Sequence, residues 1–157
     1  ALYFLGDYEL YARIAQLNQD TCVLPIYVGK AVPSGWRTAR VISTERKSLY
    51  GRLREHTRNI QQARTLQVGD FCCRFIILQE VETDLIVPVE ATLIRKHQPL
   101  WNSIVDGFGN HDPGQGRYNQ ARSEWDVLHP GRPWADRLKG EPPSLEEAIK
   151  KVQAYLN

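Results

Sequence analysis

Residues 25–31 read Pro-Ile-Tyr-Val-Gly-Lys-Ala and complete a short apolar run that extends from Cys22 to Gly29. An apolar run of this length that ends in glycine is typical of a strand followed by a turn. Two similar runs, Ala1 to Leu5 and Phe71 to Leu78, each have a Gly-Asp pair on one side. The three runs together predict a sheet of three strands.

Segments with helical spacing of apolar residues lie between and after these runs. Residues 8–18 repeat leucine and isoleucine at helical intervals and predict a helical insertion. Longer helices are predicted from Ser48, a suitable N-cap, to Arg64 and from Pro88 to about Lys96. Residues 31–47 contain Pro, Ser and Gly and are expected to form a loop. This order indicates an α/β (α+β) fold with a small mixed or antiparallel three-stranded sheet flanked by helices.

The composition changes after residue 102, where glycine, proline and aromatic residues become frequent. We therefore expect a core over residues 1–102, a loop-rich extension over residues 103–143 and a C-terminal helix over residues 144–157, all within a single domain. Ser144 and Glu147 form the capping-box pattern that begins a helix. The apolar face of this helix and the loop around Trp36 are candidate contacts with a second copy of the chain.

The overall composition excludes several classes of protein. With 157 residues, 42% of them hydrophobic, the chain can bury a core and is not intrinsically disordered. No apolar run is long enough to span a bilayer, and no signal peptide is evident, so we expect no membrane association and a cytoplasmic, intracellular protein of prokaryotic type. Cys22, Cys72 and Cys73 lack the spacing of a zinc site and are expected to be reduced thiols.

Positive charge is concentrated between Lys30 and Arg64, where nine basic residues stand against two acidic ones. Such a block is typical of a protein that binds a polyanion, although a solvated helix face gives the same pattern. Arginine outnumbers lysine 14 to 6 in the chain, and its planar fork suits phosphates and guanine edges. The candidate DNA-binding residues of this block are Arg37, Arg40, Arg54 and Arg58.

Five blocks of sequence resemble the GIY-YIG nuclease superfamily, and they occur in the family's order over roughly residues 1–102. Tyr27-Val28-Gly29 is similar to the YIG half of the signature. Ala1-Leu2-Tyr3 is similar to the first half, with alanine in place of the usual glycine and a helical segment inserted before the second half. The later blocks are Arg52-Leu53-Arg54-Glu55-His56, Val89-Glu90-Ala91-Thr92-Leu93-Ile94 and Pro99-Leu100-Trp101-Asn102.

This resemblance implies a GIY-YIG nuclease core with loop-rich insertions and a set of catalytic residues, namely Tyr3, Tyr27, Lys30, Arg52, His56, Glu90 and Asn102. Glu90 would bind Mg²⁺ (or Mn²⁺), a hard ion that prefers oxygen ligands, and no small-molecule cofactor is expected. Arg52 and His56 lie at i and i+4 and can meet one phosphate. Asn102 would orient the glutamate helix or a backbone phosphate.

Three residues are candidates for the general base. A tyrosine needs nearby cations to lower its pKa before it can accept a proton near neutral pH, and Lys30 and Arg52 could supply them to Tyr27 or Tyr3. His56 occupies a position that is often tyrosine in the family and is the third possibility.

The extension has the polar and aromatic density of a DNA-recognition loop, with candidate contacts at Arg117, Asn119, Gln120 and Arg122. Two other interpretations compete with it. His111, Asn119 and His129 could form a histidine-asparagine-histidine metal site, or the segment could simply wrap the sheet and bury Trp125 and Trp134.

Core and extension together look most like the type II restriction endonuclease branch of the superfamily. This implies a Mg²⁺-dependent enzyme that cleaves double-stranded DNA as a homodimer at a palindromic site, which the arginine content suggests is GC-rich. A structure-specific repair or homing-type nuclease of the same superfamily and a non-catalytic DNA-binding module on the same core are the alternatives.

Overall fold

The computed structural model describes residues 1–32, 47–78 and 80–157. Its strands are β1 (Leu2–Phe4) and β2 (Phe71–Cys73). Its α-helices are α1 (Ala12–Asn18), α2 (Lys47–Gln62), α3 (Ile86–His97), α4 (Leu100–Ser103), α5 (Glu124–Leu128) and α6 (Leu145–Leu156), with short 3-10 turns at Glu9–Tyr11, Val68–Asp70, Glu80–Leu85 and Ala135–Arg137. Arg37, Arg40, Trp36 and most of the expected loop 31–47 lie outside the described residues.

The sheet is smaller than the sequence predicts. β1 and β2 pair antiparallel, with Leu2 opposite Cys73 and Phe4 opposite Phe71. The expected third strand, residues 22–29, joins this pair only through a single bridge between Leu2 and Tyr27. The three-stranded sheet is therefore not confirmed: the part of the chain that the structure describes contains a two-stranded sheet with one bridged segment beside it.

Two asparagine side chains explain why residues 22–29 do not form a full strand. The Asn18 Oδ1 accepts hydrogen bonds from the backbone N–H groups of Val23 and Leu24, at 3.0 and 2.9 Å. At the other end, Asn102 bonds both the N–H and the carbonyl of Val28. Buried backbone groups must find partners, and here side-chain amides supply them in place of a neighbouring strand.

Most predicted helices are present. α2 and α6 occupy the expected segments, and the Ser144 Oγ accepts a hydrogen bond from the Glu147 N–H at 3.4 Å. α3 begins two residues earlier than expected, so Pro88 stands in its first turn, where a missing N–H leaves no bond unmade. No helix among the described residues is both long and apolar enough to cross a bilayer.

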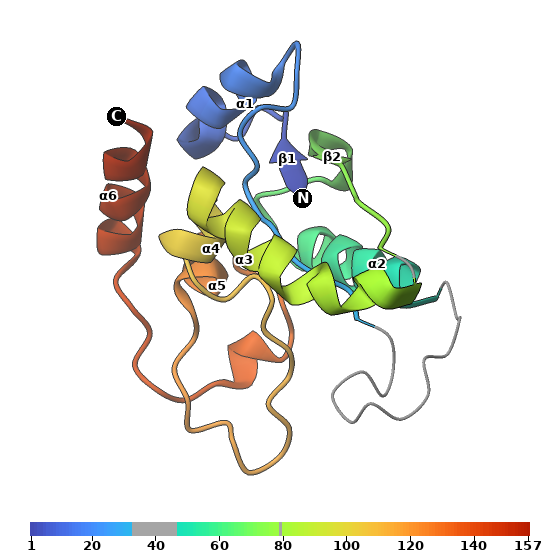
Figure 1. The fold of residues 1–157 in the computed structure, drawn as a ribbon. Helices are drawn as coiled ribbons and strands as arrows, with labels where there is room; N and C mark the ends of the chain where they lie inside the picture. The colour runs from blue at the N-terminus through green and yellow to red at the C-terminus, as the bar shows by residue number, and fades with distance from the viewer. Residues whose placement is uncertain (33–46, 79) are drawn as a thin grey trace.

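One core joins the N-terminal strands to the helices that follow residue 103. It contains Phe4 of β1, Trp101 of α4 and Trp125 of α5, together with Val152 of α6. Figure 1 shows β1, β2 and α1 at the top, α2 and α3 below them, and α5 and α6 to the left. Because Val152 is fully buried in this core, the apolar face of α6 is used within the chain, and Leu145 is its exposed large apolar residue.

Candidate active site

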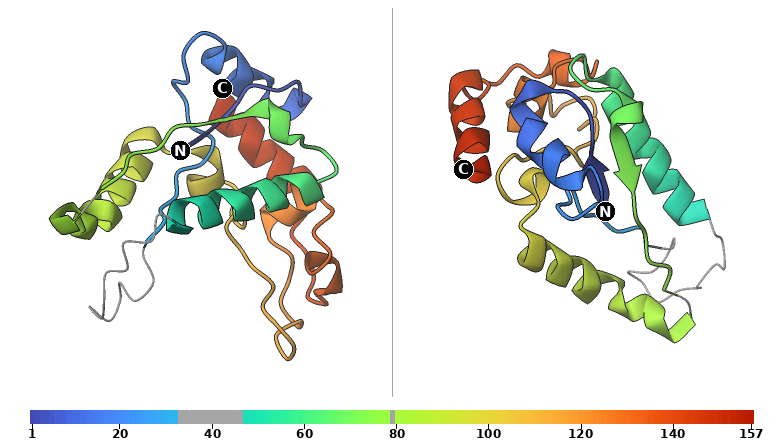
Figure 2. Two further views of the ribbon diagram at one scale, coloured as in Figure 1. Left: turned by 90° about the vertical axis from the view of Figure 1, so that its right-hand side faces the viewer. Right: turned by 90° about the horizontal axis from the view of Figure 1, so that it is seen from above.

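A cleft of about 1090 Å³ opens between β1, residues 25–31, α2 and α3. Six of the seven candidate catalytic residues line it: Tyr3, Tyr27, Lys30, Arg52, His56 and Glu90. They come from four separate segments, so only the fold brings them together. The right-hand view of Figure 2 shows how α2 and α3 diverge on two sides of the N-terminal segments.

Asn102, the seventh candidate, lies behind the cleft. Its Oδ1 accepts from the Val28 N–H at 2.7 Å, and its Nδ2 donates to the Val28 carbonyl at 2.8 Å. The side chain therefore fixes the segment that carries Tyr27, and both ends of its amide are occupied. Both of its hydrogen bonds go to Val28, so the role expected for Asn102 toward the glutamate helix or a phosphate stays a prediction.

Tyr27 lies in a narrow space between two glycines and Arg52. A Cβ on Gly29 would lie 2.7 Å from the Tyr27 ring, so only glycine permits the ring to fold back over this backbone. A Cβ on Gly109 would lie 3.4 Å from the Tyr27 hydroxyl oxygen. The same oxygen accepts a long hydrogen bond from Arg52 Nη2 at 3.5 Å. The Tyr27 hydroxyl is thereby placed next to a positive charge.

Arg52 is a partly buried cation beside Tyr27. Its Nη1 donates to Glu55 at 2.9 Å and lies 3.4 Å from the His111 Nε2. Burial lowers the pKa of Arg52, but the hydrogen bond to Glu55 and the neighbouring Tyr27 outweigh burial and raise it. Arg52 Nε is buried and has no hydrogen-bond partner among the described residues. A charged donor without a partner is suited to an anionic oxygen of a substrate.

His56 lies one helical turn after Arg52 and is 5% exposed. Its ring stacks on Phe108, with centroids 4.9 Å apart and planes inclined by 17°, and meets the Tyr27 ring edge-on at 5.1 Å. Burial, followed by the charge of Arg52, lowers the pKa of His56 to about 3. The ring is therefore neutral near pH 7, and its Nδ1 has no partner among the described residues.

Glu90 and Lys30 form an ion pair across the cleft, with the Glu90 side chain 17% exposed. Within the described residues no three His, Cys, Asp or Glu side chains are grouped closely enough to hold a metal ion by themselves. One accessible carboxylate still fits Mg²⁺, since this ion keeps several waters and is commonly bound by one or two carboxylates plus substrate phosphates.

Tyr3 has different surroundings from Tyr27. It lies on β1 opposite Cys72, and the Arg74 guanidinium lies over its ring at 5.6 Å. Burial raises the pKa of Tyr3, and Arg74 only partly opposes this effect. Neither Lys30 nor Arg52 is among the groups that shift the pKa of Tyr3. Tyr3 therefore stays protonated near neutral pH.

The candidate DNA-binding arginines of α2 do not line the cleft. Arg54 and Arg58 are exposed, and they project from a different side of the helix than Arg52 and His56. In the extension, Arg117, Asn119 and Gln120 are exposed, whereas Arg122 pairs with Asp136 at 3.5 Å. Arg117 and Gln120 line a separate cavity of about 380 Å³, together with His111.

His129 excludes the histidine-asparagine-histidine interpretation of the extension. It is fully buried, and its two ring nitrogens bond the Tyr11 hydroxyl and the Thr65 hydroxyl, each at 2.6 Å. Neither nitrogen is available to a metal ion. Trp125 is likewise fully buried, as the wrapping interpretation expects, while Trp134 is only partly covered.

Two groups of residues in the site were missed by sequence reasoning. Phe108 and Gly109 form a wall against His56 and Tyr27, and Arg132 with Asp126 holds this wall from behind. No periodicity or motif in the extension distinguishes these residues. The glycine-aromatic sequence at 107–109 is the only available signal, and it is shared by many loops.

Comparison with protein families identifies a match that covers nearly the whole chain. The model of the family described as the Eco29kI GIY-YIG domain matches residues 1–156. The match includes the extension and α6 as well as the segments that carry the cleft. Among curated proteins, the search finds no match.

Proposed function

The chain belongs to the Eco29kI GIY-YIG family of type II restriction endonucleases, and from this we propose that it cleaves double-stranded DNA at a specific site with Mg²⁺ or Mn²⁺. One observation on this chain's own residues supports the proposal. Tyr27 contacts both Arg52 and His56 in the cleft, and Glu90 of α3 pairs with Lys30 across it. Phosphodiester hydrolysis needs a proton acceptor, cations for the phosphoryl oxygens and a metal ligand.

Arg52 binds the scissile phosphate in this proposal. Its side chain is 26% exposed, each Nη keeps a second N–H beyond its bond to Glu55 or Tyr27, and the Glu55 bond fixes the side chain in orientation. Lys30, whose side chain is 37% exposed, supplies a second positive charge. Both cations gain interaction as charge accumulates on the phosphoryl oxygens.

Tyr27 and His56 are the two proton acceptors that the geometry favours for the attacking water. The Tyr27 hydroxyl accepts a hydrogen bond from the charged Arg52, and the neutral His56 has an unpartnered Nδ1. As the water oxygen bonds to phosphorus, its proton passes to one of these groups and the bond to the leaving oxygen breaks. Tyr3 is less suited to this role, because burial raises its pKa.

Glu90 would hold the metal ion, with water and phosphate oxygens completing the coordination. The ion supplies charge neutralisation at the phosphoryl oxygens. In its absence Lys30 balances the carboxylate. Lys30 would thus be released toward the phosphate when Glu90 takes a metal.

Specific recognition is assigned in this proposal to the extension, residues 103–143, with the core over residues 1–102 carrying the chemistry and the helix at 144–157 closing the fold. Figure 2 shows the segment between α4 and α5 as a loop that projects from the body of the molecule. Arg117, Asn119 and Gln120 lie on it with exposed side chains. DNA contacts are further proposed at Arg37, Arg40, Arg54, Arg58 and Arg122. A homodimer on a palindromic, GC-rich site would present the same residues to both strands.

Digestion of an unmethylated plasmid with Mg²⁺ and with EDTA tests the function. Discrete fragments in Mg²⁺ alone are the expected result. A smear would instead favour a structure-specific or nonspecific nuclease of the superfamily, and intact plasmid in both reactions would favour a non-catalytic DNA-binding module. Sedimentation with the cleaved DNA tests the dimer, which a single protomer that cuts both strands in one binding event would refute.

A further inference from the structure

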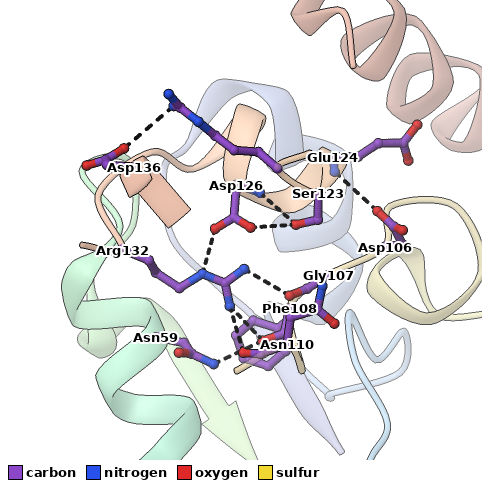
Figure 3. A network of polar contacts seen from close by, with 11 residues as sticks. Asn59, Asp106, Gly107, Phe108, Asn110, Ser123, Glu124, Asp126, Arg132 and Asp136 are labelled. Atoms are coloured by element: carbon purple, nitrogen blue, oxygen red, sulfur yellow. Dashed lines mark hydrogen bonds and ion pairs between the residues drawn. The ribbon is translucent and has the colours of Figure 1, made fainter. Parts of the chain in front are cut away.

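Arg132 is a fully buried arginine outside the cleft, and all its contacts are internal. Its Nε donates to Asp126 Oδ1 at 2.6 Å, and Asp126 in turn accepts from the Ser123 hydroxyl at 2.7 Å. The guanidinium lies between the rings of Trp125 and Trp134, at 4.5 and 4.6 Å from their centroids. Figure 3 shows this network around the guanidinium. The side chain is therefore neutralised, stacked and fixed in one orientation.

The other guanidinium donors all point to the backbone of residues 107–110. Nη2 donates to the Gly107 carbonyl at 2.9 Å, while Nη1 is shared between the carbonyls of Phe108 and Asn110 at 3.3 and 3.2 Å. Asn59 of α2 also donates to the Phe108 carbonyl, at 2.9 Å. This turn needs support, because Gly107 has a φ of +105°, a conformation that strongly favours glycine.

Arg132 is itself tied to the helix that carries Arg52 and His56. The preceding residue, Gly131, packs so closely on the end of α2 that a Cβ would lie 1.9 Å from the Gln62 carbonyl oxygen. The Arg64 N–H donates to the Pro130 carbonyl at 2.9 Å. Residues 130 and 131 are therefore fixed to the end of α2, and Arg132, which follows them, holds residues 107–110.

Residues 107–110 in turn contact the reacting end of the cleft. Phe108 stacks on His56 and meets the Tyr27 ring edge-on at 4.8 Å, and Gly109 faces the Tyr27 hydroxyl. We propose that Arg132, with Asp126, is a positioning residue of the nuclease reaction: it holds the 107–110 turn so that Phe108 and Gly109 fix His56 and Tyr27. This inference rests on the proposed function and extends it to a buried residue that touches no substrate.

Stability alone does not account for this arrangement. Desolvation of a buried ion pair largely offsets its attraction, so apolar residues of similar size commonly stabilise a core as well or better. An apolar side chain, however, could not bond three carbonyl oxygens that converge from one turn. The guanidinium fork fits that task, and lysine has neither the fork nor the planar face.

The first experiment measures the position of His56 without DNA. Stacking on Phe108 places the His56 ring protons over an aromatic face, which moves their NMR signals upfield. In protein with labelled histidines, Arg132→Lys should reduce this displacement and Phe108→Leu should remove it, with His97 at the end of α3 unchanged. Signals of His56 that stay in place in a folded Arg132→Lys protein would overturn the positioning role.

The second experiment measures cleavage and DNA affinity separately. Arg132→Lys and Phe108→Leu should each lower the single-turnover rate about tenfold to a hundredfold, the range for lost positioning of catalytic groups. The dissociation constant for DNA without a divalent ion should stay within about twofold, because neither residue is exposed to DNA. Equal losses in affinity and rate, or an unchanged rate, would overturn the inference.

Val152→Ala supplies the control for a general loss of stability, since Val152 is fully buried on α6 and makes none of the hydrogen bonds that hold the 107–110 turn. It should lower Tm and leave the rate and the His56 signals unchanged. If Arg132→Lys does not fold, Phe108→Leu still decides the outcome, because it preserves every bond of the buried network. A parent protein that cuts no DNA refutes the proposed function, whereas the NMR result decides the positioning role independently.

Discussion

Residues 1–102 and residues 103–157 both contact the reacting end of the cleft, but with different kinds of residue. The first region contributes the polar side chains that can do chemistry, such as Arg52 and Glu90, and these follow a recognisable order. The second contributes Phe108 and Gly109, which are apolar and held by a buried arginine. The sequence motifs pointed to the polar candidates, whereas Phe108 and Gly109 became apparent only from the fold.

Among changes that distinguish the two regions, replacement of Glu90 is expected to have the largest effect on the cleavage rate. Glu90→Gln should abolish cleavage while DNA binding stays intact or becomes tighter, because the change removes both the metal ligand and a negative charge near the phosphate. Plasmid digestion and filter binding measure the two properties. Glu141→Gln, at an exposed position of the extension, is the matched control and should cut normally. Turnover of Glu90→Gln near the parent rate in Mg²⁺ would remove Glu90 from the metal site.

Arg52 and His56 come next in expected effect. Arg52→Ala and His56→Ala should each lower the cleavage rate roughly tenfold to a thousandfold, the range for loss of an electrostatic or acid-base group. Circular dichroism should remain that of the parent, since both residues are positioned on an intact α2. Arg13→Ala, on the exposed face of α1, should retain the parent rate. Loss of the helical signal in the His56 variant would assign that residue to the core instead.

Part of the candidate site could be predicted from the sequence. The grouping of Tyr27, Arg52, His56 and Glu90 could be predicted because each has a place in the family's motifs, and the structure brings all four into one cleft. The role of Asn102 could not, because an amide bonds a phosphate or a peptide group equally well. Its contacts with Val28 depend on where α4 packs.

The same reasoning applies to the fold. Helix α6 was predictable, since its cap and its apolar spacing are local features of the sequence. The third strand is not confirmed because side-chain amides take the place of a neighbouring strand along residues 22–29: Asn18 bonds Val23 and Leu24, and Asn102, 74 residues away, bonds Val28. The buried position of Arg132 could not be predicted either, because a charged residue in a loop is expected at the surface and only the assembled fold buries it.

The two tyrosines of the cleft allow a finer test within the first region. Tyr27→Phe should lower the cleavage rate more than Tyr3→Phe, because Arg52 contacts the Tyr27 hydroxyl whereas burial raises the pKa of Tyr3. Rates measured from pH 6 to pH 9 should keep the parent's profile in the Tyr3 variant. The reverse ranking would transfer the proton-accepting role to Tyr3, and mild effects in both variants would assign it to His56.

The smallest expected effect concerns stability and compares one histidine from each region. Burial lowers the pKa of both His56 and His129 to about 3, well below the ordinary value of 6.5. Both are neutral in the folded and the unfolded chain above pH 6.5, so neither contributes a pH dependence there. Below pH 6.5 only the unfolded chain takes up protons at these rings, so stability falls as the pH drops toward 3.

At pH 5 each histidine should account for a loss of at most about 2 kcal/mol relative to pH 7. Urea unfolding at the two pH values measures this loss, and His56→Gln or His129→Gln should each reduce it. The histidines then differ in a second respect. His129 has both ring nitrogens bonded to hydroxyls, whereas the Nδ1 of His56 has no partner among the described residues. Under conditions in which both variants are fully folded, only the His56 variant should therefore cleave DNA more slowly than the parent. A cleavage defect in a stably folded His129→Gln protein would mean that the second region acts in the reaction through more than the 107–110 turn.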